Sequence, residues 1–168
     1  MRLLVLLPVV VMGCAKAAPS SSRSTEPMDF TLPTYPSRDP FTLKSQRGHV
    51  VMLDVWATWC EPCRDSLPLY QTLARKYLDR GFRLYTLNVD SEAAVPAEIP
   101  RFINETKLSL PIILDADAKL AEEQLKVKVM PTALLFDRQG RVRYVHEGFE
   151  SKSMSEVTGQ LEMLLNEP

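Results

Sequence analysis

Cys60 and Cys63 are separated by two residues and follow directly after an apolar run over residues 50–55. The run is typical of a buried strand, and apolar residues at helical spacing after Cys63 indicate a helix. A helix N-terminus stabilises negative charge, so a cysteine placed there ionises more readily than a free thiol. The second cysteine is close enough to attack a mixed disulfide formed by the first. The spacing therefore predicts a redox dithiol, with Cys60 as the attacking thiol and Cys63 as the resolving one.

The sequence leaves two other uses of this cysteine pair open. A zinc site needs further Cys or His ligands, and the domain offers only His49 and His146. A structural disulfide suits an exported protein, but a bridge that closes so small a loop restricts the unfolded chain little. We therefore expect no metal and no cofactor, and we assign no functional role to either histidine.

Asp54 is the only charged residue in the apolar run before the cysteines. If its side chain is buried, the ionised form is disfavoured and the pKa of the carboxyl rises. Such a carboxyl beneath the inner thiol is able to take the proton of Cys63, which makes Asp54 a predicted catalytic residue. The alternative is a carboxylate at the edge of the sheet that reaches solvent.

The composition indicates one globular domain with additional segments. The chain has 168 residues, of which 45% are hydrophobic, and its net charge of -1 favours no nucleic-acid partner. It has three cysteines, which cannot all pair within the chain. The third, Cys14, follows the N-terminal apolar segment.

That N-terminal segment has the features of an export signal. Arg2 precedes an apolar run over residues 3–12, which is too short to span a membrane. The last residues of the run, with Gly13 and Cys14, resemble a bacterial lipoprotein lipobox, which implies a signal peptide over 1–13 and a lipid on Cys14. An ordinary cleavage site at Ala-Lys-Ala, which would remove Cys14, and a hydrophobic cytosolic N-terminus are the alternatives. Residues 14–27 are small and polar, as in a flexible tether, so we expect the folded domain over 28–168.

Strand and helix patterns alternate along this domain. We expect a hairpin over 30–43, strands at 50–56, 82–89, 111–114 and 133–136, and a return strand at 141–146. Helices are expected after Cys60, at 97–107, at 118–125 and at 154–165. This order predicts an α/β fold with a mixed central sheet flanked by helices.

These features resemble the thioredoxin superfamily, and within it the extracytoplasmic TlpA/ResA-like thiol-disulfide oxidoreductases. The matching pieces are Asp-Phe-Thr-Leu-Pro at 29–33, Trp-Ala-Thr-Trp-Cys-Glu-Pro-Cys at 56–63, Asn-Val-Asp at 88–90, Met-Pro-Thr at 130–132 and Phe-Asp-Arg-Gln-Gly at 136–140. The resemblance covers residues 28–168. It implies a thioredoxin-like fold with an N-terminal hairpin and a helix–strand insertion over 91–128.

The resemblance also implies substrate contacts around the cysteines. Met130 and Pro131 would be joined by a cis peptide bond packed against the dithiol, with the Met130 backbone free to pair with a substrate peptide. Trp59 and Pro62 would contact the substrate as well. Other interpretations are a proline that begins a strand at Pro131, and core packing for Trp56 and Trp59.

The function implied is a membrane-tethered thiol-disulfide oxidoreductase that reduces disulfides of exported proteins, apocytochrome c among them. Its electrons would come from a membrane-bound donor. We expect a monomer in the bacterial cell envelope, facing the periplasm and held by lipid on Cys14, or soluble in the periplasm if Cys14 is removed. Glu61 beside Cys60 disfavours the thiolate, and Cys-Glu-Pro-Cys is common among the reducing members, so we expect a reductant. Thioredoxins carry a Lys where this chain has Thr86, so Asp54 lacks that cationic partner.

Two alternative functions remain. The opening Asp-Phe-Thr-Leu-Pro also occurs in peroxiredoxins, which are thiol peroxidases, but their Pro-x-x-x-Thr-x-x-Cys pattern would need Pro and Thr where this chain has Leu53 and Ala57. A non-enzymatic metal-binding module would need a placed histidine in addition to the two cysteines.

Overall fold

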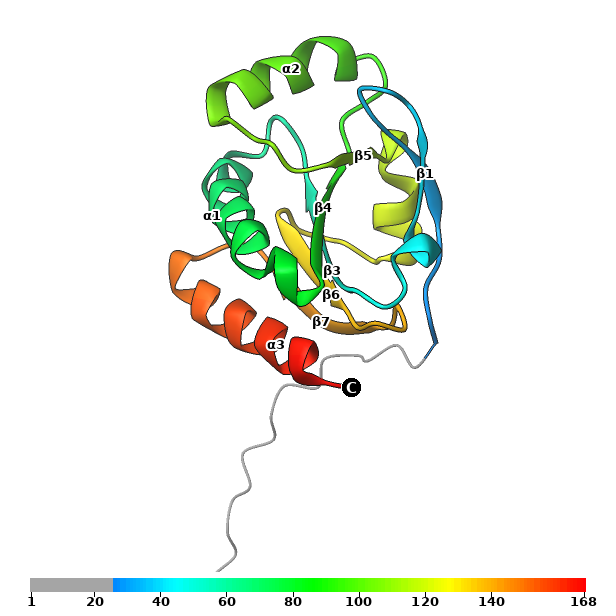
Figure 1. Cartoon of the computed structure of the whole chain (residues 1–168). Coiled ribbons are helices and arrows are strands. Elements are labelled where there is room, and N and C mark those ends of the chain that lie inside the picture. The colour runs from blue at the N-terminus through cyan, green and yellow to red at the C-terminus, as the bar shows by residue number, and fades with distance from the viewer. Residues whose placement is uncertain (1–25) are drawn as a thin grey trace, which may run out of the picture.

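A mixed seven-stranded sheet organises residues 26–168, the part of the chain that the computed structural model describes (Figure 1). The strands are β1 (Thr31–Tyr35), β2 (Pro40–Thr42), β3 (Val50–Trp56), β4 (Phe82–Asn88), β5 (Ile112–Leu114), β6 (Thr132–Phe136) and β7 (Val142–Glu147). The α-helices are α1 (Glu61–Tyr77), α2 (Val95–Thr106) and α3 (Met154–Asn166). The predictions for the signal peptide, for Cys14 and for most of the tether lie outside the described residues.

The strand order is β2-β1-β5-β4-β3-β6-β7, which confirms the predicted mixed sheet and the N-terminal hairpin. β3 pairs in parallel with β4, from Val50 opposite Phe82 to Trp56 opposite Asn88. On its other side β3 pairs antiparallel with β6. The helix–strand insertion consists of α2 and β5, which lie between β4 and β6 in the chain.

Helices α1 and α3 lie together on one face of the sheet (Figure 1). Their buried side chains pack on Val50 and Met52 of β3 and on strands β4 and β6. On the other face, residues of the hairpin and Leu120 and Ala121 pack on Val51, which points away from α1 because strand side chains alternate. β3 is therefore buried on both faces, as its continuous apolar run predicts.

Two expected helices differ in their limits or type. α2 begins at Val95 rather than at residue 97, since a proline in the first turn gives up an N–H that the helix does not use. The helix expected over 118–125 is instead a 3-10 turn, Ala116–Ala118, followed by a short π-helix, Leu120–Gln124. Asp117 and Ala118 have positive φ values, which interrupt a continuous helix, and the Asp115 carboxylate accepts hydrogen bonds from the two N–H groups that start the second piece.

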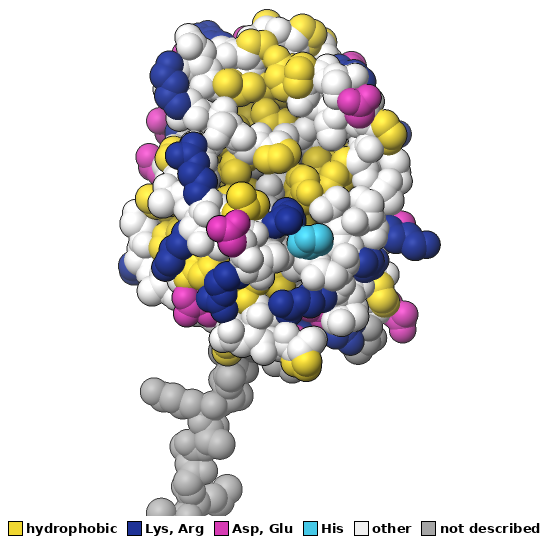
Figure 2. All heavy atoms as spheres, viewed as in Figure 1, with side chains coloured by type: hydrophobic (Ala, Val, Ile, Leu, Met, Phe, Trp, Pro, Cys, Tyr) yellow, Lys and Arg dark blue, Asp and Glu magenta, His cyan; other side chains and the backbone are white. Residues whose placement is uncertain are grey.

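Charges of both signs share the face shown in Figure 2, in keeping with a net charge of -1. Hydrophobic side chains gather in the upper part of this face, where α2 lies. Among residues 26–168, no helix combines the length and the apolar content needed to cross a bilayer.

Candidate active site

Cys60 and Cys63 form a disulfide at the start of α1, directly beyond the carboxyl end of β3. Their sulfurs are 2.04 Å apart, and their Cα atoms are 5.4 Å apart. Cys60 caps the N-terminus of α1, and Cys63 lies inside the first turn. Because Cys60 is 5% exposed and Cys63 is 0% exposed, an incoming disulfide reaches Cys60 first.

The loop that precedes Cys60 is held by Asp90, a residue for which the sequence predicts no role in the site. The Thr58 backbone N–H donates to Oδ2 of this buried carboxylate at 3.0 Å, and the Thr58 hydroxyl donates to Oδ1 at 3.0 Å. Asn88 donates its side-chain N–H to the same carboxylate at 2.7 Å. These bonds tie the end of β4 to the redox loop. The signal in the sequence is two polar residues, Asn88 and Asp90, at the end of an apolar strand.

Asp54 lies within β3 and is 0% exposed, which excludes the solvent-reaching carboxylate at a sheet edge. Neither of its carboxyl oxygens has a hydrogen-bond partner among the described residues. Burial raises the pKa of Asp54 well above its ordinary value. Across the ladder stand Thr86 and Ala133, and the Thr86 hydroxyl donates to the Pro111 carbonyl instead. Burial, and then the charge of Asp54, also raise the pKa of Tyr70 on α1.

The segment before β6 supplies the other side of the site. The Met130–Pro131 peptide bond is cis, as the resemblance implies, and Met130 packs against the cluster that contains both cysteines. Trp59 is 70% exposed and Val129 is 50% exposed, and Pro62 is exposed between the cysteines. The surface around the disulfide is therefore apolar on two sides.

The two tryptophans of the motif have different environments. Trp56 is fully buried, and its ring centroid lies 4.5 Å from that of Phe102 on α2. Its indole N–H has no hydrogen-bond partner among the described residues. Core packing therefore accounts for Trp56, whereas Trp59 is open to a substrate.

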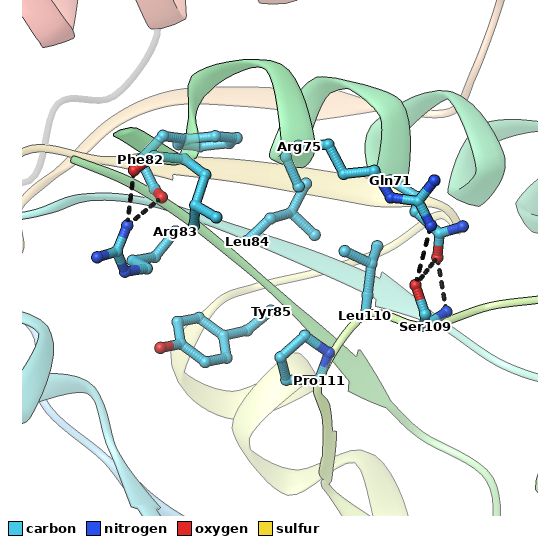
Figure 3. Close-up of a pocket in the computed structure, with 11 residues that line it drawn as sticks. Gln71, Arg75, Phe82, Arg83, Leu84, Tyr85, Ser109, Leu110 and Pro111 are labelled. Atoms are coloured by element: carbon cyan, nitrogen blue, oxygen red, sulfur yellow. Dashed lines mark hydrogen bonds between the residues drawn. The ribbon is translucent and has the colours of Figure 1, made fainter. Parts of the chain in front are cut away.

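Cavities lie both beside the disulfide and far from it. One of about 120 Å³ is lined by Met130, by apolar residues around it and by Glu122 and Lys128, and one of about 400 Å³ by Trp59, Thr58 and Asp90. A further cavity, of about 210 Å³, lies between α1, the start of β4 and the loop before β5 (Figure 3). Neither cysteine lines it, and the rim residues Arg75 and Arg83 donate to Ser109 and to backbone carbonyls. Neither cysteine lines the first two cavities either, but these are lined by Trp59, the neighbour of Cys60, and by Met130, which packs against the cluster that contains the cysteines.

The described residues contain no group of three His, Cys, Asp or Glu side chains placed to hold a metal ion. His146 lies on β7, where its Nε2 is 2.7 Å from the Gln160 side-chain oxygen. His49 precedes the first residue of β3, at the opposite end of the strand from the cysteines. Neither histidine is brought to the cysteine pair.

Comparison with protein families matches residues 20–161 to the Redoxin model. The chain belongs to the Redoxin family. Its relatives include the thioredoxin-like protein YneN of Bacillus subtilis, 30% identical over 76% of this chain and 73% of that protein. The thiol-disulfide oxidoreductase ResA of Oceanobacillus iheyensis is 29% identical over 63% of this chain, and the match spans 53% of that protein. Among solved structures, a Chlorobium tepidum protein assigned as thiol:disulfide interchange protein DsbE is 29% identical, with a TM-score of 0.77 over 88% of this chain and 100% of that chain.

The names of these relatives describe thiol–disulfide chemistry, which agrees with the cysteine pair at the start of α1. The fold is thioredoxin-like, and the chain is a thiol-disulfide oxidoreductase that carries the Cys60–Cys63 pair. The match spans only about half the length of the ResA of Oceanobacillus iheyensis, so the substrates and partners of that protein are not assigned to this chain by the match.

Asp54→Asn should stabilise the fold increasingly as the pH rises. The pKa of Asp54 is raised in the folded protein, so its effect on stability is absent below the ordinary carboxyl pKa of about 4 and becomes unfavourable above it. We expect the advantage of the variant to grow by up to ~1.4 kcal/mol per pH unit until Asp54 ionises in the folded state. Urea unfolding of the oxidised protein between about pH 4 and pH 8 measures this difference. The control is Asp79→Asn at an exposed position, and a stability difference for Asp54→Asn that does not vary with pH would contradict the prediction.

Proposed function

We propose that the protein is a membrane-tethered reductase of disulfides in exported proteins. The observation that carries this proposal is the arrangement of Cys60 at the N-terminus of α1, Cys63 one turn inside it and the unpartnered Asp54 buried in the adjoining strand. Cys63 is fully buried, whereas Cys60 is slightly exposed. Cys60 is therefore the sulfur that attacks a substrate, and Cys63 is the one that resolves the mixed disulfide. A purely structural disulfide has no need of the exposed apolar surface that flanks it.

The reaction proceeds in two thiol–disulfide exchanges. The Cys60 thiolate attacks one sulfur of the substrate disulfide, whose S–S bond breaks and releases a substrate thiolate. Cys63 then gives its proton to the ionised carboxylate of Asp54, and its thiolate attacks the Cys60 sulfur of the mixed disulfide. The second substrate thiolate leaves, and the Cys60–Cys63 disulfide of the structure is the product. The substrate thereby gains two electrons. A membrane-bound dithiol donor then reduces the Cys60–Cys63 disulfide and restores the two thiols.

Substrate binding is assigned to the residues that surround the disulfide. Trp59 and Pro62 offer exposed apolar surface, and the Met130 backbone next to Pro131 pairs with an extended substrate segment. Met130 also lines the cavity of about 120 Å³, whose apolar part suits an apolar side chain near the substrate cysteine. Exported proteins with such cysteines, apocytochrome c among them, are the proposed substrates.

Reduction rather than oxidation is the proposed direction. Glu61 adjoins Cys60, and its negative charge opposes the stabilisation of the thiolate by the helix end. A less stabilised thiolate means a less stabilised reduced form and a lower potential. The proposed membrane location depends on the N-terminal segment. Residues 1–13 would act as a signal peptide, and lipid on Cys14 would hold the protein in the cell envelope.

Cys63→Ser should trap mixed disulfides between Cys60 and substrates, because the resolving thiol is lost while the attacking thiol remains. The trapped species are expected on non-reducing gels after alkylation and should disappear on reduction. Cys60→Ser is the matched variant and should trap none. Trapping by Cys60→Ser alone would reverse the two assignments.

The reduction potential of the pair should lie nearer to that of thioredoxin, about -270 mV, than to that of DsbA, about -120 mV. Equilibration with glutathione or dithiothreitol buffers measures it. Glu61→His should raise the potential, because a cationic or neutral side chain replaces the carboxylate beside Cys60. Glu123→His at an exposed position outside the site serves as the control. A wild-type value close to that of DsbA would make this protein a disulfide donor.

Cys14 should carry lipid when the protein is expressed with its leader in a bacterial host. Two acyl chains are enough for stable anchoring, so the protein should label with palmitate and fractionate with membranes. Cys14→Ser should lose both the label and the membrane association. A soluble mature protein that begins at Ala18 would favour the ordinary signal peptide instead.

A further inference from the structure

Arg64 joins the start of the redox helix to the inserted helix α2. It directly follows Cys63, and its guanidinium carbon lies 4.7 Å from the centroid of the Phe102 ring on α2. Its Nη1 is 2.9 Å from Oε2 of Glu105, also on α2, and its Nε is 3.7 Å from Oε2 of Glu61. The arginine therefore lies between the carboxylate beside Cys60 and a carboxylate of the insertion.

The insertion supports this arginine from the core as well as from the surface. Phe102 is buried, and its other neighbour is the buried ring of Trp56 at the end of β3. Glu105 is ion-paired with Arg101 as well as with Arg64, and the hydrogen bonds from these two arginines lower its pKa. Arg64 is thus stacked on one side and ion-paired on another, with 32% of its side chain exposed.

We infer that Arg64 sets the balance of charge at the redox pair, and that Glu105 and Phe102 are the positioning residues that hold it there. This inference rests on the proposed function, because it takes Cys60–Cys63 as the working pair. Arg64 directly follows Cys63 in α1 and is ion-paired with the side chain beside Cys60, which places its charge near the pair. A fixed cation there favours the Cys60 thiolate and opposes the effect of Glu61.

Several charged groups surround the pair, and each belongs to an element packed near it. They are Asp54 on β3, Glu61 and Arg64 on α1, Asp90 after β4, Glu98, Arg101 and Glu105 on α2, and Glu122 and Lys128, which line the cavity beside Met130. Among these, Arg64 is the cation with direct contacts to both α1 and α2 carboxylates. The α2 insertion thereby takes part in the electrostatics of a site to which it contributes no sulfur.

The test compares Arg64→Gln, Arg64→Lys and the control Arg75→Gln, which removes an exposed cation from the same helix outside the site. Two quantities are measured: the midpoint of the Cys60 thiolate titration by ultraviolet absorbance, and the equilibrium constant of the pair with glutathione.

Charges near a helix end change such equilibria by roughly two- to fivefold. For Arg64→Gln we expect a higher titration midpoint and a two- to fivefold more reducing pair, a shift of about 9–21 mV at about 30 mV per tenfold. Arg64→Lys keeps the charge but loses the planar stack, so its values should lie between those of the wild type and Arg64→Gln.

The role of Glu105 is tested by Glu105→Gln in the presence and absence of Arg64. Glu105→Gln should shift both quantities in the same direction as Arg64→Gln but less far, because it releases the arginine from the position in which its charge acts on the pair. In the Arg64→Gln background this shift should shrink, since Glu105 acts through the arginine. An unchanged shift would overturn the positioning role, and equal values for Arg64→Gln and Arg75→Gln would overturn the inference as a whole. Both of these tests compare variants with one another. The wild-type potential is a separate measurement, and a strongly oxidising value would overturn the proposed direction of the reaction but not the role of Arg64.

Discussion

The burial of strand β3 on both faces is the constraint on which the site depends. All residues from Val50 to Trp56 are buried, with β4 paired on one side and β6 on the other. A strand held in this way has one register, because a slip by one residue would move every side chain to the opposite face. The chain leaves the sheet at the end of β3 and enters α1, so the position of Cys60 follows from the position of the strand.

The same burial explains why a single carboxyl in β3 matters. An ionised carboxylate without partners is strongly disfavoured in the interior, and the described residues offer Asp54 neither a hydrogen-bond donor nor a cation. The group therefore exchanges a proton at a higher pH than an exposed carboxyl. Cys63 is 0% exposed and has no direct access to solvent, so a buried carboxyl in the adjoining strand is the proton acceptor that the proposed mechanism assigns to it.

Much of the fold and part of the site could be predicted from local patterns. β3 has the expected limits of 50–56, because a continuous apolar run fixes both its type and its burial. The segment near Asp117 could not be predicted, since a positive φ and a capping carboxylate leave no periodic signal. The links made by Asp90 and by Arg64 also escape, because they join residues far apart in the sequence, and such contacts exist only once α2 and β4 have packed against α1.

The charges at the start of α1 do not act with equal weight on the redox pair. The helix end supplies about half a positive charge, and Glu61 opposes it from a side chain that is 88% exposed. Water screens such a charge, whereas Arg64 is 32% exposed and held on two sides, so less of its effect is lost to solvent. The two side chains therefore act on the thiolate in opposite directions and with unequal weight. Cys60 itself is 5% exposed, and burial disfavours a thiolate as it disfavours any anion. The burial of Cys60 therefore acts on the thiolate in the same direction as the carboxylate beside it.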